Sequence, residues 1–313
     1  MRAAAAGRSP RRNEAVEEAA ARLGGLAERD APLGARTTYR LGGPAALLAV
    51  VHDEAELAVV VDAVAASGVE VLVLGRGSNL LVAEAGFAGL CIVLGRAYET
   101  MTIERDGTVV AGGAVAYPAL ARTTAEAGLS GLEWAVGIPG SVGGAVRMNA
   151  GGHGSQTADR LVSVRLVALR RRTDQTVTAG DLGLSYRRSA VQPEEVVVSA
   201  RFGLEAGDRE ASLTAIAGIV AWRRENQPGG RNAGSIFQNP PGDSAGRLIE
   251  LAGLKNLAVG KARVSARHAN FIQADRAATA DDVFALLCEV RRLVAERCGV
   301  ELATEICLVG FPP

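Results

Sequence analysis

The sequence is most distinctive at Gly137-Ile138-Pro139-Gly140-Ser141-Val142-Gly143-Gly144-Ala145, which runs on into Asn149-Ala150-Gly151-Gly152. Four glycines fall within the eight residues 137–144, and Pro139 has no backbone N–H to donate. This composition is unfavourable inside a helix or strand, because glycine loses the most backbone freedom on ordering. We therefore predict a loop whose main chain is closely approached by another group.

A second glycine loop lies upstream, where Gly75-Arg76-Gly77-Ser78-Asn79 separates two apolar runs, Val71–Leu74 and Leu80–Val82. It resembles the start of a dinucleotide-binding fingerprint, but it lacks the third glycine and the following helix. We predict that it joins two strands, as a tight hairpin turn or as a nest of N–H groups that holds an anion. Together, the two loops favour a bound dinucleotide or a similarly large anionic cofactor.

The flanking sequence predicts short strands and capped helices. Asp53 and Gly68 bound one helix, Asp106-Gly107 marks a hairpin turn, and Thr279 with Asp282 forms a capping box. The remaining helices are expected at 13–23 with Asn13 as cap, 118–128, 209–225, 244–252 and 281–297, and further strands within 91–116, 161–169 and 196–202. Helices dominate only after residue 204, so we expect a domain boundary near 204–210.

Composition excludes several classes of protein. The chain has 313 residues, of which 48% are hydrophobic and 22% charged, so wholesale disorder is excluded. A net charge of +0 gives no general support for binding nucleic acid or an anionic membrane. No apolar run approaches the ~18 residues of a membrane-spanning helix. The four cysteines and three histidines show no metal-binding spacing, so we expect no metal and a reduced, cytoplasmic protein.

A series of motifs, in matching order over about residues 30–310, closely resembles the UDP-N-acetylenolpyruvoylglucosamine reductase (UDP-N-acetylmuramate dehydrogenase) family. The motifs are Thr38–Ala45, Leu74–Leu81, Gly137–Ala145, Asn149–Gly151, Tyr186–Ser189, Ala233–Pro240, Ala266–Ile272 and Glu305-Ile306. Taken together, the segments Gly137–Ala145 and Gly234–Pro240 are highly specific for this family.

The resemblance implies an α+β fold with two domains. An FAD-binding domain of the vanillyl-alcohol-oxidase (PCMH) type is expected at 13–204, in subdomains of about 13–70 and 71–204. A C-terminal α+β substrate-binding domain follows at 205–313, and residues 1–12 are expected to be disordered. The family short subtype, without the extra tyrosine-bearing loop, is expected because the chain between Pro193 and Ser235 is short.

The resemblance also implies the reaction, which is reduction of UDP-N-acetylglucosamine enolpyruvate to UDP-N-acetylmuramate in peptidoglycan precursor synthesis. FAD is the expected bound cofactor and NADPH the co-substrate. Binding of nucleic acid or membrane is not expected, and the protein is expected to be a monomer. The main alternative is another FAD-dependent oxidoreductase of the same superfamily. A third hypothesis is a nucleotide-binding or scaffold protein that has lost catalysis.

Three residues match the family catalytic positions. Ser235 resembles the proton donor, although a lone serine is more often a turn or helix cap. Arg187 resembles the arginine that stabilises the intermediate, with the adjacent Arg188 as a competing assignment. Glu305 resembles a glutamate that donates to the substrate carboxylate or orients a water, a choice that the sequence leaves open, and Glu301 competes with it.

Other matched positions imply binding roles. The flavin-binding residues are Gly75, Arg76, Gly77, Ser78, Asn79, Leu80, Gly137, Ile138, Pro139, Gly140, Ser141, Gly143, Gly144 and Ala145. The substrate-binding residues are Tyr186, Asn239, Lys255 and His268. Lys255 suits a diphosphate but can equally be a solvated surface lysine, and His268 can equally be structural. The residues Gln238, Asn256 and Thr304 depart from the family pattern, which puts details of the pocket in doubt.

Overall fold

A computed structural model describes residues 10–312 and divides them into two compact units. Unit 1 contains the chain up to Ala31, Ala45–Arg76 and Ala88–Ala221, whereas unit 2 contains Pro32–Pro44, Gly77–Phe87 and the chain from Trp222 on. This division differs from the single boundary expected near residue 204. Unit 1 instead continues to Ala221. It therefore includes most of helix α5 (Arg209–Asn226), whose Ile216 is buried in a core of unit 1.

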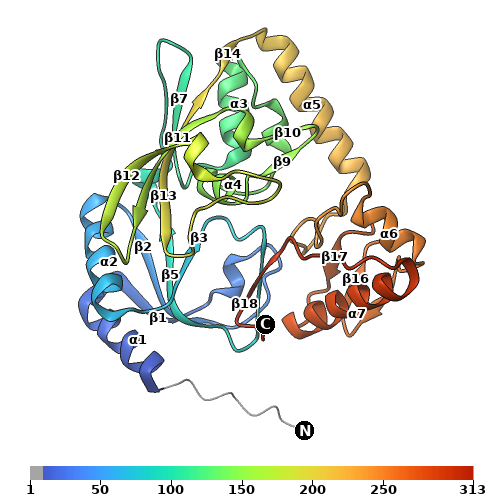
Figure 1. Cartoon of the computed structure of the whole chain (residues 1–313), viewed down its shortest axis with the longest axis horizontal. Helices are drawn as coiled ribbons and strands as arrows, with labels where there is room; N and C mark the ends of the chain where they lie inside the picture. Colours follow the sequence, from blue (N-terminus) through green and yellow to red (C-terminus); the bar gives the residue numbers. More distant parts are fainter. Residues whose placement is uncertain (1–9, 313) are drawn as a thin grey trace. The chain divides into compact units, whose positions relative to one another are not determined.

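The first sheet of unit 1 has the strand order β1-β2-β5-β3, and helices α1 and α2 pack on it (Figure 1). Its strands are β1 (Ala27–Ala31), β2 (Ala45–Val51), β3 (Val71–Leu74) and β5 (Phe87–Leu94). Because β1 and β2, which precede residue 70, share this sheet with β3 and β5, which follow it, the expected subdomain division at 70/71 also differs from the structure. The predicted caps of helix α2 (Glu54–Ser67) are confirmed, because the Asp53 side chain accepts the Glu56 N–H and the Gly68 backbone is in the left-handed conformation.

The N-terminal helix starts earlier than the sequence indicated. Helix α1 spans Pro10–Leu23, so residues 10–12 are helical rather than disordered, and Asn13 lies inside the helix instead of capping it. Proline is well tolerated in the first turn of a helix, where its missing N–H has no partner to lose. The rest of the expected disordered segment, residues 1–9, lies outside the described residues.

The second sheet of unit 1 is antiparallel, with the order β12-β11-β13-β7-β6. Its strands are β6 (Met101–Ile103), β7 (Thr108–Gly112), β11 (Leu161–Ala168), β12 (Thr173–Thr178) and β13 (Glu195–Gly203). Helices α3 (Tyr117–Glu126) and α4 (Val142–Arg147) contribute to its core, where Tyr117 packs edge-on against Trp134. Two strand pairs are shorter, β8 (Leu129–Ser130) with β14 (Glu205–Ala206), and β9 (Gly151–Gly152) with β10 (Ser155–Gln156).

Unit 2 is assembled from three separate stretches of chain. Its strands are β4 (Leu80–Val82), β15 (Ala258–Val259), β16 (Ala262–Val264), β17 (Ile272–Ala274) and β18 (Cys307–Val309), and its helices are α6 (Ala245–Leu251) and α7 (Ala280–Cys298). Strand β4 pairs in parallel with β18, and Tyr39 donates its buried hydroxyl to the Ile272 carbonyl at 2.9 Å. The Thr279–Asp282 capping box of α7 is confirmed. None of the helices described over residues 10–312 combines the length and apolarity needed to cross a membrane.

Candidate active site

The two glycine loops meet inside unit 1. Ser141 caps helix α4, and its Oγ accepts the Gly144 N–H at 3.3 Å. A Cβ on Gly75 would lie 2.4 Å from that same oxygen, so only glycine fits there without a shift. The loop that precedes α4 and the first residue of the 75–79 loop are therefore in direct contact.

The prediction that the whole 137–145 segment lies outside regular structure is wrong for its second half. Gly143 and Gly144 belong to the first turn of α4. The Gly143 N–H donates to the Gly113 carbonyl at 2.9 Å, and a Cβ at Gly143 would lie 3.2 Å from that oxygen. Here glycine allows the start of the helix to approach the end of β7 closely. The reason for the glycine is a close approach, as predicted, but the approaching group is the protein's own backbone.

The 75–79 loop joins strand β3 to strand β4, which confirms that it is not a strand-to-helix dinucleotide fingerprint. In unit 2 the Gly77 carbonyl accepts the Thr38 N–H at 3.0 Å. The Asn79 side-chain amide donates to the Glu305 carbonyl at 3.0 Å, and the Asn79 carbonyl accepts the Cys307 N–H at 3.0 Å. Asn79 thus binds the chain that carries the predicted catalytic glutamate.

Ser235 lies directly before a segment that the fold holds firmly. Gly234 has a φ of +75°, and the next two N–H groups, of Ile236 and Phe237, donate to the carbonyl and Oδ1 of Asn270, each at 3.0 Å. The Asn270 amide returns a bond to the Phe237 carbonyl at 2.8 Å, and Asn270 is only 3% exposed. The buried side-chain amide of Asn270, bonded through both its oxygen and its nitrogen, and the Asn270 backbone carbonyl together fix the backbone that follows Ser235.

Glu305 lies beside this segment. Its N–H donates to the Ile236 carbonyl at 2.8 Å, and Thr304 pairs with Phe237 in an isolated antiparallel bridge. The regular strand β18 begins only at Cys307, two residues later than the expected strand at Glu305. The predicted proton donor and the predicted acid therefore stand on two neighbouring stretches of backbone in unit 2.

The other predicted site residues of unit 2 each bind another residue of that unit. Lys255 forms an ion pair with Glu250 at 2.6 Å. The Asn239 Oδ1 accepts the Ala245 N–H at 3.0 Å, at the start of α6. The His268 Nδ1 accepts the Asn270 N–H at 3.3 Å, and burial, followed by nearby charge, lowers the pKa of His268 below its ordinary value.

Arg187 and Tyr186 form the two-residue tip of a tight turn in unit 1, closed by two backbone bonds between Ser185 and Arg188. The Arg187 φ is +56°, in the left-handed region that non-glycine residues seldom occupy. Its Nη2 donates to the Gly151 carbonyl at 2.9 Å, and its guanidinium carbon lies 4.9 Å from the centre of the Tyr186 ring. The competing Arg188 is exposed.

The turn is anchored by Asn149, which sequence analysis quoted within a motif but gave no role. Asn149 is fully buried and donates through Nδ2 to the Ser185 carbonyl at 2.9 Å, while its Oδ1 accepts the Ala158 N–H at 2.9 Å. Asn270 was missed in the same way. In both cases the only available signal was an asparagine inside a quoted motif, because its partners are distant in sequence.

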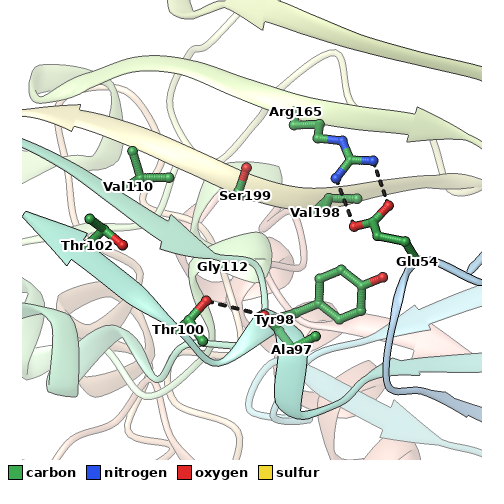
Figure 2. A pocket seen from close by; sticks show the side chains of 10 residues that line it. All are labelled: Glu54, Ala97, Tyr98, Thr100, Thr102, Val110, Gly112, Arg165, Val198 and Ser199. Carbon is green, nitrogen blue, oxygen red and sulfur yellow. Dashed lines mark hydrogen bonds and ion pairs between the residues drawn. The ribbon is translucent and has the colours of Figure 1, made fainter.

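A pocket of about 190 Å³ in unit 1 is separate from these residues (Figure 2). Its ten lining residues include Glu54, Tyr98 and Arg165, and none of the ten is a predicted site residue. Arg165 pairs with Glu54 at 2.7 Å and with Asp174 at 2.6 Å, so its charge is already compensated. Burial, with Glu54 next, raises the pKa of Tyr98 to about 12. This pocket therefore offers no support for the predicted chemistry.

Two family models match the chain. The family described as "FAD binding domain" matches residues 45–171, and the family described as "UDP-N-acetylenolpyruvoylglucosamine reductase, C-terminal domain" matches residues 226–309. These matches confirm a flavin-binding part followed by a C-terminal domain, and the helices and sheets of the two units confirm the expected α+β fold class.

Individual relatives match over most of their length. A UDP-N-acetylenolpyruvoylglucosamine reductase from Heliobacterium modesticaldum is 44% identical over 283 residues, covering 89% of each chain. One from Rubrobacter xylanophilus is 42% identical over 295 residues, covering 93% of this chain and 98% of that one. The crystal structure of the Thermus caldophilus enzyme superposes with a TM-score of 0.79 at 36% identity, covering 90% of this chain and 98% of that one.

Proposed function

The chain belongs to the UDP-N-acetylenolpyruvoylglucosamine reductase family, and from this premise we propose that NADPH is its reductant and that Ser235, Arg187 and Glu305 are its catalytic residues. It is an oxidoreductase with FAD as cofactor, and it reduces UDP-N-acetylglucosamine enolpyruvate to UDP-N-acetylmuramate in peptidoglycan synthesis. The observation that best supports the proposed residues is the bond from the Glu305 N–H to the Ile236 carbonyl, which holds Glu305 beside the backbone of Ser235.

The residues present fit a flavin. The Ser141 hydroxyl lies where a Cβ of Gly75 would stand, so the 75–79 loop and the loop before α4 meet at one place, and both are rich in glycine, as a nest for a large anionic group requires. We assign FAD to the segments Gly75–Ser78 and Gly137–Ala145. Bound there, FAD would supply the hydride chemistry that carries reducing equivalents from NADPH to the terminal carbon of the substrate alkene.

Ser235 supplies the proton that completes the reduction. Addition at the terminal alkene carbon leaves negative charge on the adjoining carbon and its carboxylate. The Ser235 O–H bond breaks, a C–H bond forms at that carbon, and the serine oxygen is reprotonated from solvent. Serine is a weak acid, but the enolate-like intermediate is a strong base. A short side chain after Gly234 can also approach the carbon closely.

Arg187 and Glu305 stabilise the negative charge that develops on the carbon and carboxylate of the substrate. The planar guanidinium of Arg187 suits a carboxylate through paired N–H groups, and Tyr186 stacks on it. Glu305 donates a proton to the substrate carboxylate or orients a water. For the remainder of the substrate we assign Tyr186, Asn239, Lys255 and His268. The Lys255 ammonium serves the diphosphate, exchanging its contact with Glu250 for the phosphate oxygens.

One anaerobic absorbance experiment tests the proposal. The purified protein is mixed with NADPH and then with UDP-N-acetylglucosamine enolpyruvate, while the flavin band is followed. We expect the band to bleach with NADPH and to return with the sugar. A band that stays bleached after the sugar is added would point to another substrate of the same flavoenzyme superfamily. The expected monomeric state, the cytoplasmic location and the short-subtype assignment stay predictions.

A further inference from the structure

Asn79 connects the 75–79 loop to the chain segment that carries Glu305 through a bond outside the strand ladder. The pairing of β4 with β18 begins at Leu80 and Cys307, and the Asn79 carbonyl extends it by accepting the Cys307 N–H. The Asn79 side chain then reaches one step further and donates to the Glu305 carbonyl at 3.0 Å. Backbone pairing alone would leave that carbonyl beyond the end of the ladder.

The two peptide groups of Glu305 are consequently held from two directions. Its N–H is bound by the Ile236 carbonyl, one residue after Ser235, and its C=O is bound by Asn79. The direction of a Cα–Cβ bond follows from the orientation of the two peptide groups on either side of it. Fixing both groups therefore fixes the direction of the Glu305 Cα–Cβ bond, from which the side chain and its carboxyl group extend.

We propose that Asn79 is a positioning residue for Glu305, and not chiefly a ligand of the flavin. Its amide N–H sets the orientation of the Glu305 backbone, and through it the placement of the carboxyl group relative to Ser235. The inference rests on the proposed function, because it presumes that Glu305 acts in the reduction of the sugar. Sequence analysis placed Asn79 with the flavin-binding residues, and the two roles predict different defects.

The first test uses Asn79→Ala and Asn79→Asp, of which the second keeps the size of the side chain but loses the donor. As a positioning residue, Asn79 should leave the dissociation constant of FAD and the rate of flavin reduction by NADPH unchanged. We expect the rate of flavin reoxidation at saturating sugar to fall by about 10–100-fold, the usual effect of removing a group that orients a functional one. A flavin ligand would instead give weaker FAD binding in both variants, which would overturn the proposal.

The second test is a double-mutant cycle with Glu305→Ala, read as the same reoxidation rate. If Asn79 acts through Glu305, Asn79→Ala should have little further effect once the carboxyl group is absent, so the two losses should not add. Additive losses would overturn the positioning role. If Glu305→Ala alone reoxidises at the wild-type rate, the proposed role of Glu305 fails instead, and the two failures are thereby distinguished.

A matched control removes another amide from the same stretch. The Gln238 Nε2 donates to the Thr304 carbonyl at 3.5 Å, one residue before Glu305. We expect Gln238→Ala to reoxidise within about twofold of the wild-type rate. An equal loss in this variant would mean that general loosening of the segment, rather than the bond to Glu305, causes the defect. If Asn79→Ala does not fold, Asn79→Asp, which keeps the size of the side chain and loses the donor, replaces it in both tests.

Discussion

At the scale of single residues, the site depends on polar side chains that hold backbone rather than substrate. Asn270 satisfies the N–H groups that follow Ser235, and Asn149 satisfies the carbonyl that begins the Arg187 turn. Each is a buried amide with partners far away in sequence. Replacing either amide would leave the backbone groups that it binds without that partner.

The role of Ser235 can be isolated by Ser235→Ala. Removing a proton donor should slow reoxidation of the reduced flavin by the sugar about 10²–10⁴-fold, whereas reduction by NADPH should continue at the wild-type rate. Stopped-flow absorbance of the two half-reactions measures both. Wild-type reoxidation in this variant would remove Ser235 from the mechanism, and an equal slowing of both halves would indicate a role in the fold.

At the scale of elements, the predictions that succeeded rest on local signals. The caps of α2 and α7 depend on residues three positions apart, and the strand-to-strand nature of the 75–79 loop follows from the apolar run Leu80–Val82 in place of a third glycine and a helix. The helical start of α4 was missed because Gly143 is required by the distant Gly113 carbonyl. The anchoring of the Arg187 turn by Asn149 was missed for the same reason, since no local pattern reveals such a contact.

The turn that carries Arg187 should lose its anchor in Asn149→Ala. The Ser185 carbonyl would keep its bond from the Arg188 N–H but lose the one from Asn149, and the Ala158 N–H would lose its bond to Asn149, at about 0.5–1.5 kcal/mol for each bond lost. We expect the free energy of unfolding in urea to fall accordingly. The control is Asn226→Ala on α5, where an exposed amide bonds to the Trp222 carbonyl, and there the change should stay within about 0.5 kcal/mol. Equal losses in both variants would contradict the anchoring role.

At the scale of the whole molecule, the division into units could not be predicted from composition. Residues 32–44 and 77–87 belong to unit 2, although they lie within the span expected for the flavin domain. Tyr39, Leu41 and Leu81 are buried in the same core as α6 and α7. Nothing in the local sequence of these short segments indicates which of two cores they enter, because that choice depends on contacts with residues far along the chain.

A fragment that starts at Trp222 should accordingly fail to fold alone. It lacks Tyr39, Leu41 and Leu81, and strand β18 has no β4 to pair with. We expect poor dispersion in its amide NMR spectrum and no cooperative thermal transition, in contrast to the full chain. A well-dispersed spectrum from the fragment would show that the two N-terminal segments are dispensable for the core of unit 2.

The pairing of β4 with β18 also has a consequence for synthesis. The ribosome makes Leu80–Val82 long before it makes Cys307–Val309. Until then β4 and Asn79 have no partner, and the strand edge is open to other chains. Unit 2 therefore completes its fold late, after translation has passed Glu305. A chain that is still being synthesised therefore cannot yet form the contacts that hold the Glu305 backbone.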